Sequence, residues 1–174
     1  VELTGHLTTA LGHEAAAFVQ RHTAQPWFLY LAFNAAHAPL EAPEAYLARV
    51  VDTGDHKRVF FSAMMQAMDD AVGRVLQTVS DLGEEENTLI VFLSDNGGPT
   101  WETSSSNGPL RGFKGTTHEG GIRVPFCMKW KGQIPEGLVY RNPVIQLDIV
   151  PTVMAAAGAP VSAVEDLDGV DLLP

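Results

Sequence analysis

The stretch TLIVFLSDNGGPT, residues 88–100, sets an apolar run directly against a polar, glycine-rich turn. Its first half reads as a buried strand, and Asp95 and Asn96 follow where that strand stops. A carboxylate and an amide carbonyl side by side are hard oxygen ligands for Ca²⁺ or Mg²⁺, although either ion needs further ligands. The same residues also suit a strand-ending turn in which Asp and Asn bond their own backbone. From this stretch alone, both interpretations stay open.

Three other segments are predicted to be helices. Apolar residues recur every three or four positions over residues 7–22 and 57–82, which predicts two amphipathic helices. Gly83 is a natural stop for the second of them. The segment LDIVPTVMAAAG (147–158) predicts a helix with Pro151 in its first turn, where the missing N–H costs nothing.

Two further runs complete the pattern of strands. The run PWFLYLAFN (26–34) predicts a strand buried on both faces, and VPFCMKW (124–130) predicts a short strand. Residues 97–121 are rich in glycine, serine and threonine and predict a long loop, and such loops in compact domains are usually functional or mobile. The alternation of helices and strands predicts an α/β fold, with a mostly parallel central sheet flanked by helices, in a single domain over residues 1–174.

His37 and the pair Asp95 and Asn96 lie where ligands bind in such a sheet, beyond the carboxyl ends of its strands. His37 follows the first predicted strand, as Asp95 follows the second. A lone loop histidine is more often structural than catalytic, but its place at the same predicted edge favours a role in the site. Lys114, between Gly112 and Gly115, suits an ammonium delivered to an oxyanion, although an isolated lysine in such a loop is usually solvated.

Other polar or reactive residues have plainer explanations. Glu119 and Arg123 are placed to pair with each other and to support the loop. The acidic run 84–86 is expected to be a solvated turn, and His118 is ambiguous. Cys127 lies within an apolar strand and is expected to be a buried, inert thiol.

Composition restricts the partners. The 174 residues carry a formal net charge of −10, which makes nucleic acid and anionic membrane surfaces poor partners. One cysteine excludes an intrachain disulfide, and the sequence shows no apolar run of membrane-spanning length. No signal peptide is visible, and because the first residues look like mid-domain sequence, we expect a fragment or a processed piece.

Taken together, five segments resemble the sulfatase family of the alkaline-phosphatase-like superfamily. They are PWFLYLAFNAAHAPL, LIVFLSDNGG, NGPLRGFKGTTHEGGIRVP, LDIVPTVMAAAGAP and DGVDLLP, in this order. The resemblance implies hydrolysis of sulfate esters by a formylglycine hydrate beside a bound Ca²⁺. The resemblance implies that Asp95 and Asn96 are two of the metal ligands and that Lys114 binds the sulfate group. It also implies that His37 contacts the sulfate oxygens or the leaving-group oxygen.

The sequence departs from the family pattern in its nucleophile. No Cys or Ser is followed by x-Pro-x-Arg, and the family's early acidic pair of metal ligands and its other Lys and His have no counterpart. The chain therefore resembles the middle and later part of a catalytic domain, with half of the Ca²⁺ site. The formylglycine is expected in an N-terminal part outside this sequence. We expect the isolated chain to be inactive, to bind Ca²⁺ weakly and to self-associate as a homo-oligomer through exposed sheet surface.

Two alternatives to a sulfatase remain at this point. One is a phosphatase, phosphodiesterase or phosphonate hydrolase, since these relatives share the fold and its metal chemistry. The other is a truncated, non-catalytic homologue. On the sulfatase interpretation the substrate is a small-molecule or glycan sulfate ester, and the family resemblance suggests a periplasmic or secreted protein.

Overall fold

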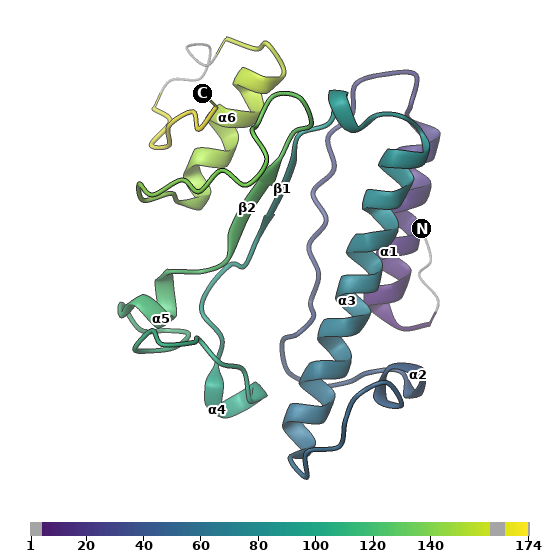
Figure 1. Cartoon of the computed structure of the whole chain (residues 1–174), viewed down its shortest axis with the longest axis vertical. Helices are drawn as coiled ribbons and strands as arrows, with labels where there is room; N and C mark the ends of the chain where they lie inside the picture. Colours follow the sequence, from purple (N-terminus) through teal and green to yellow (C-terminus); the bar gives the residue numbers. More distant parts are fainter. Residues whose placement is uncertain (1–4, 161–165, 174) are drawn as a thin grey trace. The chain divides into compact units, whose positions relative to one another are not determined.

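A computed structural model describes residues 5–160 and 166–173 of the chain (Figure 1). The described residues form two compact units. The first contains the residues up to Gly83 together with Leu93–Phe126, and the second contains Glu84–Phe92 together with the residues from Cys127 onward.

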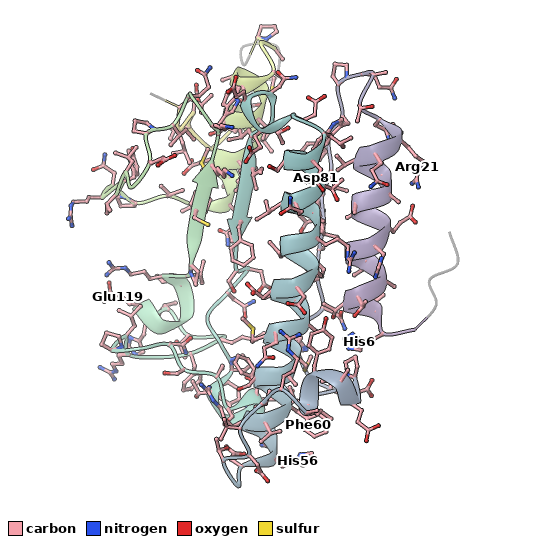
Figure 2. The ribbon with its side chains drawn as sticks, turned by 45° about the vertical axis from the view of Figure 1, so that its right-hand side comes forward. His6, Arg21, His56, Phe60, Asp81 and Glu119 are labelled. Carbon is pink, nitrogen blue, oxygen red and sulfur yellow. The ribbon has the colours of Figure 1, made fainter. Side chains whose placement is uncertain are left out.

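Two long helices that run in the same direction form the core of the first unit (Figure 2). They are α1 (Leu7–Arg21) and α3 (His56–Asp81), which confirms both predicted helices. Their facing residues are small: a Cβ added to Gly12 of α1 would lie 2.7 Å from the Cβ of Ala71 in α3. The buried residues around this contact are Ala15, Ala16, Val19, Ala63, Met64 and Ala67. Small side chains thus let the two helices approach closely and bury their apolar stripes.

Helix α3 has well-defined ends. At its start, an Asp55 carboxylate oxygen accepts a hydrogen bond from the Lys57 backbone N–H at 3.0 Å, as an N-cap does. The other Asp55 oxygen accepts from the Ser104 hydroxyl at 2.8 Å, and this bond is the main reason that the pKa of Asp55 lies below its ordinary value. At the far end Gly83, with φ of 72°, stops the helix as predicted.

The prediction of a buried strand over residues 26–34 is wrong for this chain. The segment is extended but belongs to no sheet, and it crosses Figure 1 as a plain trace. Phe28 and Tyr30 are 69% and 80% exposed. A strand needs a neighbour for its backbone groups, and the described part of the chain pairs none with this segment. The predicted self-association through such exposed surface stays a prediction.

The described sheet has two strands, β1 (Ile90–Leu93) and β2 (Phe126–Lys129), as predicted. They run antiparallel: the Ser94 N–H donates to Pro125 O at 3.1 Å, whereas at the opposite end the Trp130 indole donates to Glu86 O at 2.9 Å. A mostly parallel sheet can include such a pair. The side chains of β1 and β2 are less buried than predicted, because the described sheet has only these two strands to cover one another. Cys127 is exposed, so the prediction of a buried thiol is wrong.

Ion pairs and a buried aspartate organise the second unit. The run predicted as a solvated acidic turn includes Glu85 in a 3-10 turn, Glu85–Asn87, and its carboxylate lies 3.1 Å from both Lys129 Nζ and Lys131 Nζ. The carboxylate of buried Asp148 accepts from the backbone N–H groups of Ile145 and Val170, both at 2.9 Å.

The remaining described elements are short. Asp148 ends a second 3-10 turn, Gln146–Asp148, and precedes α6 (Ile149–Ala156), in which Pro151 lies in the first turn as predicted. Helix α2 (Glu44–Leu47) packs on α3. Over residues 5–160 and 166–173, no helix combines the length and apolar character needed to cross a bilayer.

Candidate functional site

The glycines after β1 are required by a close contact between two stretches of backbone. Gly97 N–H donates to Gly121 O at 2.9 Å, and a Cβ added to Gly97 would overlap the carbonyl oxygen of Gly120. A Cβ added to Gly120 would in turn overlap Gly112 O. The turn after the strand is therefore packed, backbone against backbone, on the glycine-rich loop that carries Lys114.

The Asn107 side chain joins the two backbone stretches by hydrogen bonds. The sequence alone did not identify it as a candidate residue. Its Oδ1 accepts from Gly98 N–H at 2.8 Å, while its Nδ2 donates to Gly98 O at 3.0 Å and to Gly112 O at 3.2 Å. One amide side chain thus satisfies both backbone groups of Gly98 and a carbonyl of the facing loop. The Asn107–Gly108 dipeptide signals only a turn in the sequence.

The loop that carries Lys114 is held by its own hydrogen bonds. The Thr116 hydroxyl donates to Phe113 O at 2.7 Å and accepts from Phe113 N–H at 3.1 Å. Gly120 N–H donates to Arg111 O at 2.7 Å. The stretch from Gly97 to Arg123 contains two helices of four residues each, α4 (Thr100–Thr103) and α5 (Glu119–Ile122). Lys114 is consequently half-buried at a defined place and is not a solvated surface lysine.

His37 and Lys114 meet although 77 residues separate them. Lys114 Nζ lies 2.9 Å from His37 Nε2, and His37 Nδ1 lies 2.7 Å from Ala38 O. A carbonyl oxygen only accepts, so Nδ1 carries the proton, and Nε2 offers its lone pair to the ammonium. The histidine is exposed and lies in the loop predicted to follow residues 26–34. The structure therefore brings together two of the four predicted site residues at hydrogen-bond distance.

Asp95 and Asn96 directly follow β1, as predicted. Asp95 is exposed and Asn96 is half-buried, and the backbone carbonyl of Asn96 accepts from the Ser94 hydroxyl at 2.9 Å. Their side chains supply oxygen donors suited to Ca²⁺, but two donors fall well short of the six to eight that this ion takes. Within residues 5–160 and 166–173, no group of three or more His, Cys, Asp or Glu side chains is placed to hold a metal ion.

The predicted pair of Glu119 and Arg123 is confirmed. Their side chains lie 3.1 Å apart, one helical turn from each other, and both are exposed. An exposed pair of this kind contributes little to stability. Its place beside the packed glycines supports the structural interpretation of these residues.

Comparison with known proteins identifies the family. The sulfatase family model matches residues 2–159. The chain is 36% identical to mouse steryl-sulfatase over 98% of its own length, and 38% identical to human arylsulfatase A over 95%. It covers only 27% and 31% of those two proteins, so it spans less than a third of the length of these relatives.

Solved structures agree. All of the chain superposes on 39% of Ps i-CgsB, crystallised in complex with k-i-k-neocarrahexaose, with a TM-score of 0.93 and 39% identity. The PsFucS1 sulfatase from Pseudoalteromonas sp. matches 98% of the chain, over 36% of its own length, with a TM-score of 0.78 and 28% identity. These matches confirm the predicted alkaline-phosphatase-like α/β fold. The chain belongs to the sulfatase family.

Proposed function

We propose that the protein containing this chain hydrolyses sulfate esters, and that His37 and Lys114 bind the sulfate group and assist its departure. The observation that carries the proposal is the 2.9 Å approach of Lys114 Nζ to His37 Nε2. It places an ammonium and an imidazole at one point, beside a backbone that the packed glycines hold rigid.

The chemistry of a sulfate ester suits this pair. The bound ester carries a negative charge, and charge moves to the leaving oxygen as its bond to sulfur breaks. The Lys114 ammonium donates to a sulfate oxygen and stabilises that charge. Once the ammonium bonds the sulfate, the lone pair of His37 Nε2 is free to take up a proton from solvent, and the imidazolium then donates that proton to the leaving oxygen. The bond from Nδ1 to Ala38 O orients the ring throughout.

Asp95 and Asn96 are proposed to supply part of a Ca²⁺ site. A bound cation would polarise the sulfate oxygens as a Lewis acid. The two side chains offer oxygen donors at the end of β1, and the remaining ligands are proposed to come from residues outside this sequence. The same holds for the formylglycine nucleophile. We therefore expect the 174-residue chain alone to leave an aryl sulfate unhydrolysed, and turnover by the pure chain would contradict this.

The comparisons support sulfate esters over the phosphate esters that remained open from the sequence. Both small-molecule and glycan sulfates stay candidates. The oligosaccharide bound to Ps i-CgsB supports a sulfated glycan. A periplasmic or secreted location is also proposed, on family membership alone.

The test uses the protein encoded by the complete reading frame that contains this chain. Hydrolysis of 4-nitrophenyl sulfate is compared in the wild type, Lys114→Ala and the control Lys131→Ala, whose lysine pairs with Glu85. Loss of a charge-stabilising donor is expected to lower kcat by about 100-fold or more in Lys114→Ala. The control is expected to keep the wild-type rate.

Other outcomes separate the alternatives. Full activity in Lys114→Ala would remove this residue from the site. Hydrolysis of 4-nitrophenyl phosphate in preference to the sulfate would move the protein to the phosphatase alternative. No hydrolysis of either ester by the wild type would indicate a non-catalytic homologue.

A further inference from the structure

The peptide unit that joins Phe113 to Lys114 is held at both of its ends. On the carbonyl side, Phe113 O accepts from the Thr116 hydroxyl at 2.7 Å and from the Thr116 backbone N–H at 3.0 Å. On the amide side, Lys114 N–H donates to Gly98 O in a longer bond of 3.5 Å. Because a peptide unit is planar, bonds at both ends define the orientation of its plane.

Lys114 occupies the second position of a tight turn. The bond from Thr116 N–H to Phe113 O closes the four residues 113–116, and Gly115 takes the third position with φ of 85°. A left-handed third residue is typical of a type II turn, in which the backbone angles of the second residue are defined as well. The turn therefore sets the direction in which the Lys114 side chain leaves the loop.

The Thr116 hydroxyl connects this turn to the packed glycines. It accepts from Phe113 N–H at 3.1 Å in addition to donating to Phe113 O, so one oxygen bonds both backbone groups of the residue before Lys114. A Cβ added to Gly112 would lie 2.6 Å from the Thr116 Oγ1, and a Cβ added to Gly121 would lie 2.9 Å from it. The hydroxyl is thus enclosed by backbone and has little room to move.

The effect of the turn reaches the proposed sulfate site through the lysine side chain. Lys114 Nζ lies 2.9 Å from His37 Nε2, which is a hydrogen-bond distance that tolerates little displacement. A small change in backbone direction at Lys114 becomes a larger displacement at the end of its long side chain. The hydrogen bonds of the Thr116 hydroxyl go to the backbone of Phe113, so any effect on the ammonium acts through Lys114.

We propose that Thr116 is a positioning residue for Lys114: its hydroxyl fixes the Phe113–Lys114 peptide and thereby holds the ammonium at His37. This inference rests on the proposed function, because it takes Lys114 as a residue that binds the sulfate group. The contrasting possibility is that the hydroxyl contributes only to folding stability, and the experiment separates the two.

The test measures kcat for 4-nitrophenyl sulfate in the protein encoded by the complete reading frame. Thr116→Val removes the hydroxyl from a side chain of nearly the same shape, and Thr116→Ser keeps the hydroxyl. Thr117→Val is the matched control, because Thr117 is the neighbouring threonine and is exposed. Thr116→Val is also combined with Lys114→Ala, which shows whether Thr116 acts through Lys114.

Thr116→Val should lower kcat about tenfold or more, because a displaced ammonium no longer meets the charge that develops on the sulfate. Thr116→Ser and Thr117→Val should keep kcat close to that of the wild type. In Lys114→Ala protein, Thr116→Val should cause no further loss, because the ammonium that it positions is already gone.

A spectroscopic readout tests the positioning directly. The ¹⁵N NMR signal of His37 Nε2 in histidine-labelled protein reports the hydrogen bond that this nitrogen accepts from Lys114. In Thr116→Val the signal should move toward its position in Lys114→Ala, whereas in Thr116→Ser and Thr117→Val it should stay at the wild-type position.

Three results would overturn the inference. They are a wild-type kcat in Thr116→Val, an equal loss in Thr116→Ser, and a loss in Thr116→Val by the same factor with and without the Lys114 side chain, as a general structural effect would give. Thr116→Ala, which removes the hydroxyl without adding bulk, is the second variant if Thr116→Val does not fold. Unfolding of both would also overturn a local positioning role.

Failure of the proposed function looks different. Lys114→Ala would then keep the wild-type kcat, or the wild type would hydrolyse no sulfate ester. In either case the His37 signal decides by itself whether Thr116 positions Lys114.

Discussion

Replacing Asn107 with alanine should destabilise the folded chain more than its surface position suggests. The side chain makes three hydrogen bonds, two to Gly98 and one to Gly112 O. Each such bond contributes about 1 kcal/mol net, and the partners that remain are part-buried backbone groups. The free energy of unfolding should therefore fall by about 3 kcal/mol, which is a large fraction of the stability of a typical domain.

The assay is urea denaturation followed by tryptophan fluorescence, together with thermal unfolding. For a chain of this size, a loss of about 3 kcal/mol corresponds to a fall in Tm of about 6–12 °C. The matched control is Asn142→Ala, because the Asn142 amide makes one long bond, 3.3 Å, to the Tyr140 hydroxyl. That variant should stay within about 0.5 kcal/mol of the wild type.

A second variant separates the two ends of the Asn107 amide. Asn107→Asp keeps the oxygen that accepts from Gly98 N–H but places another oxygen against the carbonyls of Gly98 and Gly112. It should be at least as unstable as the alanine variant. Equal stability of Asn107→Ala and Asn142→Ala would refute the reasoning that this amide holds the two loops together.

Three further results are expected. In urea denaturation, Gly97→Ala should lower the free energy of unfolding by about 2 kcal/mol or more, because the added Cβ would overlap the facing backbone. Gly73 lies in mid-helix with open space around its Cβ position, so Gly73→Ala should raise the free energy of unfolding by about 0.5–1 kcal/mol. Equal effects of the two substitutions would contradict this. The pKa of Glu85 is lowered from 4.5, chiefly by Lys129, so the stability it contributes is present above that value and is lost as the pH falls through the lowered pKa. Glu85→Gln should flatten the fall in unfolding free energy between about pH 5 and about pH 3, and an unchanged slope would count against the ion pair. Calorimetry should show Ca²⁺ binding to the chain that is weaker than micromolar and weaker still in Asp95→Asn, and micromolar binding would overturn the view of a partial site.

Local sequence patterns correctly predicted helix α3 and strand β1, whose formation depends on residues close together in the sequence. The apolar stripe of α3 and the glycine that follows it, Gly83, predicted both ends of that helix to within about one residue. Both signals depend only on residues a few positions apart, because helical periodicity and a glycine with positive φ act locally. The strand before Asp95 was predicted for a similar reason, because a continuous apolar run followed by a polar turn leaves few alternatives.

What the sequence could not provide depends on neighbours distant along the chain. Residues 26–34 have the composition of a strand, but strand formation needs a paired backbone that composition does not report. Cys127 is exposed because only one strand lies beside it in the described sheet. The three bonds of Asn107 follow from the packing of two loops, and nothing at the dipeptide itself announces them.

In the candidate site, too, the sequence identified residues, and the structure was needed to show their contacts. Residue types and the family resemblance singled out His37 and Lys114, and the structure shows that they meet. The roles of all four predicted site residues stay proposals.

The most direct test of the central claim is whether the chain binds sulfate at His37 and Lys114. Sodium sulfate is titrated into the isotope-labelled chain at constant ionic strength, and amide and side-chain signals are followed by NMR. The account predicts saturable shifts centred on His37 and Lys114 that are lost in Lys114→Ala and kept in Lys131→Ala. Shifts elsewhere, or equal binding by Lys114→Ala and the wild type, would contradict it.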